Sequence, residues 1–263
     1  MQQTVKFVPT SVGTSMLTML RKVHEQRRIA IFSGPPGIGK TTAINTFSEE
    51  QKGNVVVIKL NRTGKTGMGA RMVMQKIIMA IREITTDYNN YVYHDTYQVQ
   101  RQLSQLIGLW AEQMGASNLP HRTIIFDEAQ CLSRDAIETL RYWNDVDRCY
   151  GPVPIGLVFV GNNEFALSSS KGKKSVISDA VADRARYIEE FDYSCVENDD
   201  IKMILEAHGI ADSRAISAVI KHYSSSRTSR SLRSLVDYKI PLMRDLSGGG
   251  VIDASIVAEA LAA

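Results

Sequence analysis

Short apolar runs alternate with longer segments of helical periodicity up to about residue 191. The short runs are typical of buried parallel strands, and the longer segments are typical of amphipathic helices. This alternation predicts an α/β fold with a parallel sheet and helices on both faces. Strands are expected near 29–33, 55–60, 122–127, 155–160 and 187–191, and helices near 13–26, 40–50, 69–85, 94–115, 133–148 and 174–184.

Beyond Phe191 only the helical periodicity continues. Glu197–Asp200 is suited to an acidic first helical turn, and Gly209 is suited to a helix end. We therefore predict two domains, an α/β core over residues 1–191 and a small all-helical domain over residues 192–263. The helices of the second domain are expected near 197–208, 213–224, 229–245 and 252–262.

Composition narrows the class of protein. The chain has 263 residues, 44% of them hydrophobic, which suits a large core and excludes disordered and fibrous proteins. No apolar run would span a membrane and the N-terminus does not resemble a secretory signal, so a cytoplasmic protein is expected. Cys131, Cys149 and Cys195 are too scattered for a disulfide framework or a zinc site. The net charge of +3 does not by itself indicate a nucleic-acid partner.

The segment after the first predicted strand carries the strongest chemical signal. Its spacing, G-x-x-x-x-G-K-T, is that of a phosphate-binding loop, although an ordinary Gly-Pro turn is an alternative. The glycines let backbone N–H groups turn toward phosphate oxygens, and the next helix adds its positive N-terminus. Lys40 is predicted to reach the β- and γ-phosphates, and the Thr41 hydroxyl to bind Mg²⁺. The predicted nucleotide ligands are Gly34, Pro35, Pro36, Gly37, Ile38, Gly39, Lys40, Thr41 and Thr42.

A second apolar run, Thr123–Phe126, ends in two adjacent acids, Asp127 and Glu128. Successive side chains on an extended chain point in different directions, so the two acids can have different roles. We predict that Asp127 holds Mg²⁺ and that Glu128 activates the attacking water. The alternative is a strand followed by a helix-capping acid, since a helix begins near Ser133. Together with the phosphate loop, the pair indicates a nucleoside triphosphate hydrolase.

The phosphate loop, the acidic strand end, a polar turn after the next strand and the helical C-terminal region together resemble the AAA+ ATPases. The segments Phe7–Gly13 and Arg28–Ala43 look like the branch that contains the Mu phage B transposition protein and the TnsC-type transposon regulators. The same core also resembles ExeA-type secretion ATPases and Orc/Cdc6-type replication initiators. The resemblance implies a five-stranded P-loop core with a helical lid, ATP and Mg²⁺ as cofactors, and ATP hydrolysis.

The resemblance also implies roles for residues outside the two motifs. Asn162, with Asn163 as the competitor, matches the sensor-1 position near the γ-phosphate, although an Asx turn is another interpretation. Arg184, with Arg186 as second choice, matches the arginine that reaches the nucleotide of a neighbouring subunit, which implies a homo-oligomer. For the sensor-2 arginine of the lid, Arg233 fits best, and Arg227 and Arg230 stay open.

A basic, glycine-rich segment, Lys59–Arg71, follows the second predicted strand. In the Mu B and TnsC-type proteins the corresponding region follows DNA phosphates, a task suited to flexible basic side chains. A second basic segment covers residues 171–174, and solvated surface loops are the alternative for both. The predicted DNA-binding residues are Arg62, Lys65, Thr66, Arg71, Lys173 and Lys174.

As a function, the resemblance implies ATP-dependent assembly on double-stranded DNA as a filament or ring. Such an assembly would select target sites and stimulate a transposase, and hydrolysis would drive disassembly. No membrane partner is expected. A secretion or assembly ATPase acting on protein partners and a helicase loader or replication initiator are the alternatives.

Overall fold

The computed structural model describes residues 7–61, 67–85, 91–112, 121–144, 155–165, 177–225 and 230–262. The chain forms two compact units, each assembled from separate stretches of sequence. The helical unit comprises Met1–Leu17, Pro35–Ala43 and Phe191–Ala263, and the sheet unit comprises Thr18–Gly34 and Ile44–Glu190.

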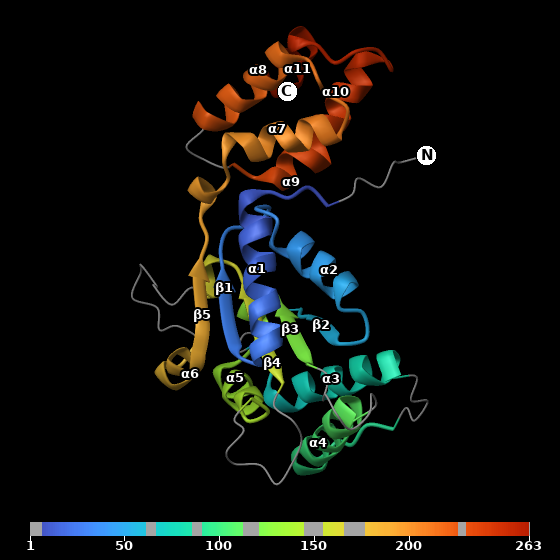
Figure 1. The fold of residues 1–263 in the computed structure, drawn as a ribbon, viewed down its shortest axis with the longest axis vertical. Helices are drawn as coiled ribbons and strands as arrows, with labels where there is room; N and C mark the ends of the chain where they lie inside the picture. The colour runs from blue at the N-terminus through green and yellow to red at the C-terminus, as the bar shows by residue number, and fades with distance from the viewer. Residues whose placement is uncertain are drawn as a thin grey trace. The chain divides into compact units, whose positions relative to one another are not determined.

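A five-stranded parallel sheet in the order β2-β3-β4-β1-β5 forms the centre of the sheet unit (Figure 1). Every residue of β1, β3 and β4 is buried, as expected for central strands that are covered on both faces. The predicted parallel α/β core is therefore confirmed. The strands are β1 (Ile29–Ser33), β2 (Val55–Lys59), β3 (Thr123–Asp127), β4 (Gly156–Gly161) and β5 (Ala185–Glu190).

The carboxyl ends of the strands meet at one edge of the sheet. Ser33 at the end of β1 is paired in register with Gly161 at the end of β4. Asp127 at the end of β3 is paired with Val160 of β4 and with Lys59 of β2. The phosphate loop begins directly after Ser33. The strand ends that carry the predicted chemistry therefore share one edge, which is where ligands bind in such sheets.

Of the helices in the described ranges, four belong wholly to the sheet unit. α3 packs against α4, α5 and β2 (Figure 1), and buried residues of these elements belong to a large apolar cluster. In that cluster the rings of Phe126 and Phe159, from adjacent strands, stack with centroids 5.2 Å apart. The helices are α3 (Ala70–Thr85), α4 (Thr96–Glu112), α5 (Arg134–Arg141) and α6 (Asp179–Arg184).

The helices α1 (Ser11–Gln26) and α2 (Lys40–Glu50) each contribute residues to both units. Two predicted helices of the sheet unit prove shorter than expected. The helix predicted over 133–148 ends at Arg141, and the Asn144 amide nitrogen that follows donates to the carbonyls of Arg27 and Ile155 at 2.8 Å. The helix predicted over 174–184 begins at Asp179, because the Ser178 hydroxyl caps it by accepting from Val181 N at 3.3 Å.

Helices α7, α8, α10 and α11 gather in the helical unit (Figure 1). The predicted start of α7 is confirmed, since Glu197 and Asp200 form a reciprocal capping box. Gly209, with a φ angle of +83°, follows its end. The helices are α7 (Asn198–Ala207), α8 (Ser213–Ser225), α9 (Leu232–Ser234), α10 (Ile240–Ser247) and α11 (Ala254–Ala262).

The single helix predicted over 229–245 is wrong in detail. A π-helical segment, Leu235–Lys239, separates α9 from α10. Pro241 lies in the first turn of α10 and has no N–H group to donate to the carbonyl four residues earlier. Proline is one of the known causes of a break in regular α-helical hydrogen bonding, and here it lies in the helix that directly follows the π-helical segment.

None of the helices in the described ranges combines the length and the apolar character that crossing a membrane requires. Cys131 and Cys195 are free thiols, and Cys149 lies outside the described residues.

A buried histidine links α1 to the start of β3. His24 is 6% exposed, and its Nδ1 lies 2.9 Å from the Thr123 hydroxyl. Burial lowers the pKa of His24 to about 4, and the neighbouring positive charges of His121, Arg122 and Arg27 act in the same direction. The imidazole is therefore neutral in the folded protein at neutral pH.

Acidification is expected to destabilise the protein through His24. The unfolded chain takes up a proton below its ordinary pKa of 6.5, whereas the folded chain does so only near 4. The stabilising contribution present above pH 6.5 is therefore lost as the pH falls toward 4, and the loss at pH 5 is on the order of 1–2 kcal/mol. Urea unfolding at pH 7.5 and pH 5 should show a smaller difference for His24→Gln than for wild type. A matched His222→Gln variant should keep the wild-type difference; equal pH dependence in all three proteins would contradict this role of His24.

Candidate nucleotide-binding site

The phosphate loop has the backbone conformation that its glycines permit. Gly37 and Gly39 have φ angles of +81° and +102°, in the left-handed region that favours glycine. A Cβ atom at position 37 would collide with the Ser231 hydroxyl, whereas at position 39 it would meet only Thr10 Oγ1 at 3.6 Å. Turns of this kind direct successive backbone N–H groups toward a common anion. The loop therefore fits a phosphate group.

Lys40 and Thr41 begin helix α2 directly after the loop. Lys40 Nζ donates to the Pro35 carbonyl at 2.8 Å, so the ammonium group bonds across the loop. Ala43 N donates to the Gly39 carbonyl at 3.0 Å, and the N–H groups nearer the helix start point along the helix axis. An ammonium group, a hydroxyl and a helix N-terminus are together suited to a triphosphate and its metal ion.

Described residues from the C-terminal part of the chain also donate hydrogen bonds to the loop within the helical unit. Arg233 N donates to the Gly37 carbonyl at 3.2 Å, and the Tyr193 hydroxyl donates to the Pro36 carbonyl at 3.3 Å. The side chain of Arg233 is exposed. The arginine that best fitted the sensor-2 pattern thus lies in the short helix α9 next to the phosphate loop.

The other two candidate arginines of the lid differ from Arg233. Arg230 Nη1 donates to the Val196 carbonyl at 2.6 Å, and its Nη2 donates to Ser224 Oγ at 3.2 Å. This guanidinium group therefore holds the end of α8 to the segment before α7. Arg227 lies outside the described residues. The placement favours Arg233 for the nucleotide contact.

Asp127 and Glu128 differ sharply in environment. Asp127 is 6% exposed at the end of β3, and its Oδ1 accepts a hydrogen bond from Glu128 N at 3.1 Å. Glu128 is exposed and has φ and ψ angles of 62° and 42°. A non-glycine residue in this left-handed region costs on the order of 1 kcal/mol, and such residues occur preferentially at functional sites. The predicted water-activating residue therefore has a strained backbone.

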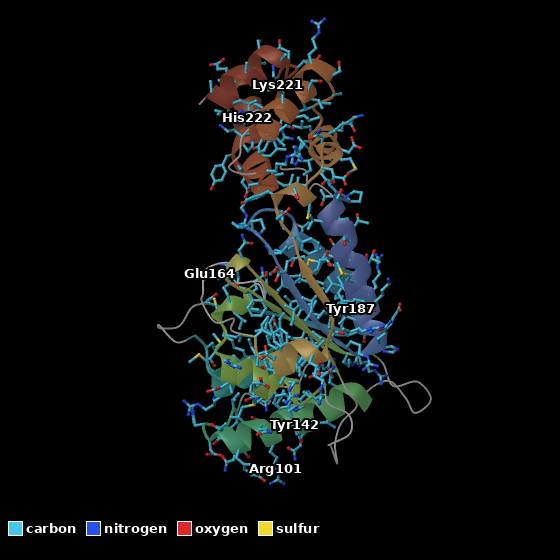
Figure 2. All side chains as sticks on the ribbon, turned by 90° about the vertical axis from the view of Figure 1, so that its left-hand side faces the viewer. Arg101, Tyr142, Glu164, Tyr187, Lys221 and His222 are labelled. Atoms are coloured by element: carbon cyan, nitrogen blue, oxygen red, sulfur yellow. The ribbon has the colours of Figure 1, made fainter. Side chains whose placement is uncertain are left out.

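Asn162, the sensor-1 candidate, directly follows β4. Its Oδ1 accepts from Glu164 N at 2.9 Å, which is the Asx turn considered as the alternative. Asn162 is half-buried, and its competitor Asn163 is exposed. In Figure 2 Glu164 lies at the end of the sheet where this turn is located. Both asparagines lie at the same sheet edge as Asp127, but the side-chain oxygen of Asn162 already accepts the hydrogen bond of the turn.

Arg184 and Arg186 are both exposed beside an edge strand. Arg184 is the last residue of α6, and Arg186 lies on β5. The next residue, Tyr187, lies alongside α1, where its hydroxyl donates to Gln26 Oε1 at 3.1 Å (Figure 2). An exposed arginine at the sheet edge is accessible to a second subunit, so the placement is compatible with the predicted intersubunit role.

Of the predicted DNA-binding residues, only Arg71 lies within the described ranges. It is exposed near the start of α3, and its Nη1 donates to the His94 carbonyl at 2.9 Å. Its guanidinium group is therefore partly engaged in holding the segment before α4. The residues outside the described ranges are Arg62, Lys65, Thr66, Lys173 and Lys174.

The ends of the basic segment are hydrogen-bonded to the segment that begins with Asp127. Leu60 N donates to the Asp127 carbonyl at 3.1 Å. Met68 N donates to the Cys131 carbonyl at 2.7 Å, and Ser133 N donates to the Met68 carbonyl at 3.0 Å. The basic segment is thus anchored, on both sides, to the stretch of chain that carries the predicted catalytic carboxylates.

Sequence reasoning missed the polar contacts of Gln130 in the sheet unit and of Asp200 in the helical unit. Gln130 contacts both Glu128 and Asn162 at the sheet edge. In the helical unit, the fully buried Asp200 accepts from Ser11 N at 2.7 Å and so caps helix α1. Asp200 and Ser11 are 189 positions apart, so no local signal could have paired them. Gln130 lies only two residues after Glu128, and that proximity was the one available sequence signal.

Comparison with known proteins identifies relatives of the fold. The sequence profile of a family described as AAA domain matches residues 22–167, whereas no curated protein matches the chain in sequence. The structure is similar to Cdc6p from Pyrobaculum aerophilum, with a TM-score of 0.67 and 16% identity over 98% of this chain and 68% of Cdc6p. RuvB from Thermotoga maritima, a Holliday junction branch migration motor, has a TM-score of 0.53 and 14% identity over 100% of this chain and 72% of RuvB. A Walker-type ATPase from Pyrococcus abyssi has a TM-score of 0.56 and 13% identity, with 94% and 70% covered. At these identities the likeness shows a shared fold.

Proposed function

Since the chain belongs to the AAA domain family and is a P-loop ATPase, we propose that it couples ATP binding to assembly on duplex DNA. The assembly is a filament or ring that selects target sites and stimulates a transposase. Hydrolysis then drives disassembly, because ATP bound between subunits stabilises the assembled state by linkage. The observation that carries this proposal is the double anchoring of the basic segment to the stretch of chain that begins with Asp127 and Glu128.

Proteins of this family bind ATP and generally use Mg²⁺, which neutralises charge on the phosphates when it is bound. In our proposal the loop amides and Lys40 hold the triphosphate, while Thr41 and Asp127 hold the metal. Glu128 orients the attacking water and takes its proton. Asn162 and Arg233 contact the γ-phosphate, and Arg184 completes the site of the adjacent subunit.

The anchoring couples DNA binding at the basic segment to the ATPase site. Basic side chains that bind backbone phosphates restrict the segment that carries them. Here the first hydrogen bond joins Leu60 to Asp127 itself, and the second joins Met68 to Cys131 just beyond Glu128. DNA that binds the basic segment therefore acts on the chain that positions both carboxylates. This arrangement favours a DNA-responsive ATPase over one that acts on protein partners alone.

The test is sedimentation with long duplex DNA in ATP, in ADP and in a non-hydrolysable ATP analogue. ATP and the analogue should give sedimenting assemblies, and ADP should not. The double variant Arg62→Ala/Lys65→Ala should lower the slope of log affinity against log salt by about 2, because each lost phosphate contact removes about one unit. Lys221→Ala, which removes an exposed lysine of α8 (Figure 2), is the matched control and should leave the slope unchanged. Failure to bind DNA at low salt would remove the proposal, and ATP-dependent assembly that ignores DNA would point to a protein-directed ATPase.

A further inference from the structure

The side-chain amide of Gln130 lies between the two polar groups that follow β3 and β4. Its Nε2 donates to Glu128 Oε2. Its Oε1 accepts from the backbone N–H of Asn162 at 3.2 Å. One amide therefore joins the predicted water-activating carboxylate to the predicted sensor-1 turn.

The two partners determine the orientation of the Gln130 amide. The carboxylate of Glu128 can only accept a hydrogen bond, and the backbone N–H of Asn162 can only donate one. A flipped amide would place oxygen against oxygen on one side and N–H against N–H on the other. The observed orientation is therefore the one that satisfies both neighbours.

Gln130 is itself held firmly by its own backbone. It is the middle residue of a short 3-10 helix, Ala129–Cys131, whose first and last residues are buried. Cys131 N donates to the Glu128 carbonyl at 2.9 Å, and the Cys131 carbonyl accepts from Met68 N at 2.7 Å. The amide thus extends from a fixed turn to the fixed end of a buried strand.

Glu128, in contrast, is exposed, and its long side chain has several rotatable bonds. Without a partner its carboxylate would sample many positions relative to an attacking water. The contact with Gln130 uses Oε2, so Oε1 keeps its lone pairs for that water. A carboxylate held at one oxygen and open at the other is pre-organised for general-base chemistry.

We infer that Gln130 is a positioning residue that holds the Glu128 carboxylate in its productive orientation by tying it to the backbone of Asn162. The inference rests on the proposed role of Glu128 and deepens it. It also connects the turn after β4 to the catalytic base, so that a change at Asn162 is transmitted to Glu128 through one side chain.

Two substitutions of Gln130 distinguish its hydrogen bond to Glu128 from its hydrogen bond to Asn162. Gln130→Glu keeps the acceptor for Asn162 N but places a second carboxylate oxygen against Glu128. Gln130→Leu removes both hydrogen bonds at similar volume. Both variants should reduce kcat by about 10-fold or more, because the Glu128 side chain is then free to adopt several rotamers. Both variants should keep nucleotide affinity within about twofold of wild type. Gln105→Glu, at an exposed glutamine of α4, is the matched control and should keep wild-type kcat.

A second measurement follows the hydrogen bond between Gln130 and Asn162 independently of activity. Amide hydrogen exchange at Asn162, followed by NMR, should accelerate in Gln130→Leu and stay near wild type in Gln130→Glu. Unchanged or increased kcat in both Gln130 variants, while Glu128→Gln is inactive, would overturn the positioning role alone. Wild-type turnover by Glu128→Gln would overturn both this inference and the proposed role of Glu128. A purely structural Gln130 would change the exchange rate and the melting temperature but not kcat.

Discussion

Glu128→Gln is expected to lower ATP turnover by about 100-fold to 10,000-fold, the range typical of losing a general base. The substitution keeps the size of the side chain and the strained backbone at this position, so it removes only the charge. ATP affinity should stay within about threefold of wild type, because the triphosphate is held elsewhere, by the loop amides and Lys40. In the proposed assembly, the variant should also stay on DNA after ATP binding.

Phosphate release and titration of a fluorescent ATP analogue measure the two quantities separately. Glu164→Gln provides the matched control, since Glu164 is an exposed acid at the same end of the sheet (Figure 2). It should keep wild-type turnover. Near-normal hydrolysis by Glu128→Gln would mean that another group activates the water.

Lys40→Ala is expected to weaken ATP binding by about 100-fold, because charge-assisted hydrogen bonds to phosphate are among the strongest single contacts in proteins. Lys40 Nζ donates to the Pro35 carbonyl, so the ammonium group lies across the loop. The loss of the hydrogen bond to Pro35 should change the melting temperature little. Calorimetric titration with MgATP measures the affinity, and Lys52→Ala, at an exposed lysine after α2, is the matched control. Equal ATP affinity in both variants would exclude Lys40 from the phosphate site.

The sheet and its active edge could be predicted because their signals are local. β1 and β3 are short runs with apolar centres, and β2 is rich in β-branched residues. Once the strands are parallel, their carboxyl ends must meet at one edge, so Ser33 and Asp127 are brought to that edge by topology. The phosphate loop was predicted for the same reason, since its glycines are required by the conformation of its own backbone.

The features that were missed depend on distant parts of the chain. Nothing in the sequence around Glu128 favours a left-handed conformation. Glu128 adopts it where the chain enters the 3-10 helix Ala129–Cys131, and that helix is held by a hydrogen bond from Met68, about 60 positions earlier in the chain. The competing interpretations of Asn162 could not be separated from sequence, since an Asx turn and a phosphate contact use the same residue type. The π-helical segment before α10 interrupts an otherwise regular helical pattern, and Pro241 was the only local indication of it.

The central claim is that the phosphate loop and the acidic end of β3 hold one nucleotide and its metal jointly. The most direct measurement is a crystal structure of the chain with Mg²⁺ and a non-hydrolysable ATP analogue. We expect the triphosphate to be wrapped by the loop before Lys40, with the metal bonded to the Thr41 hydroxyl and facing the Asp127 carboxylate. A nucleotide bound away from the loop, or a metal ion remote from Asp127, would contradict the joint site.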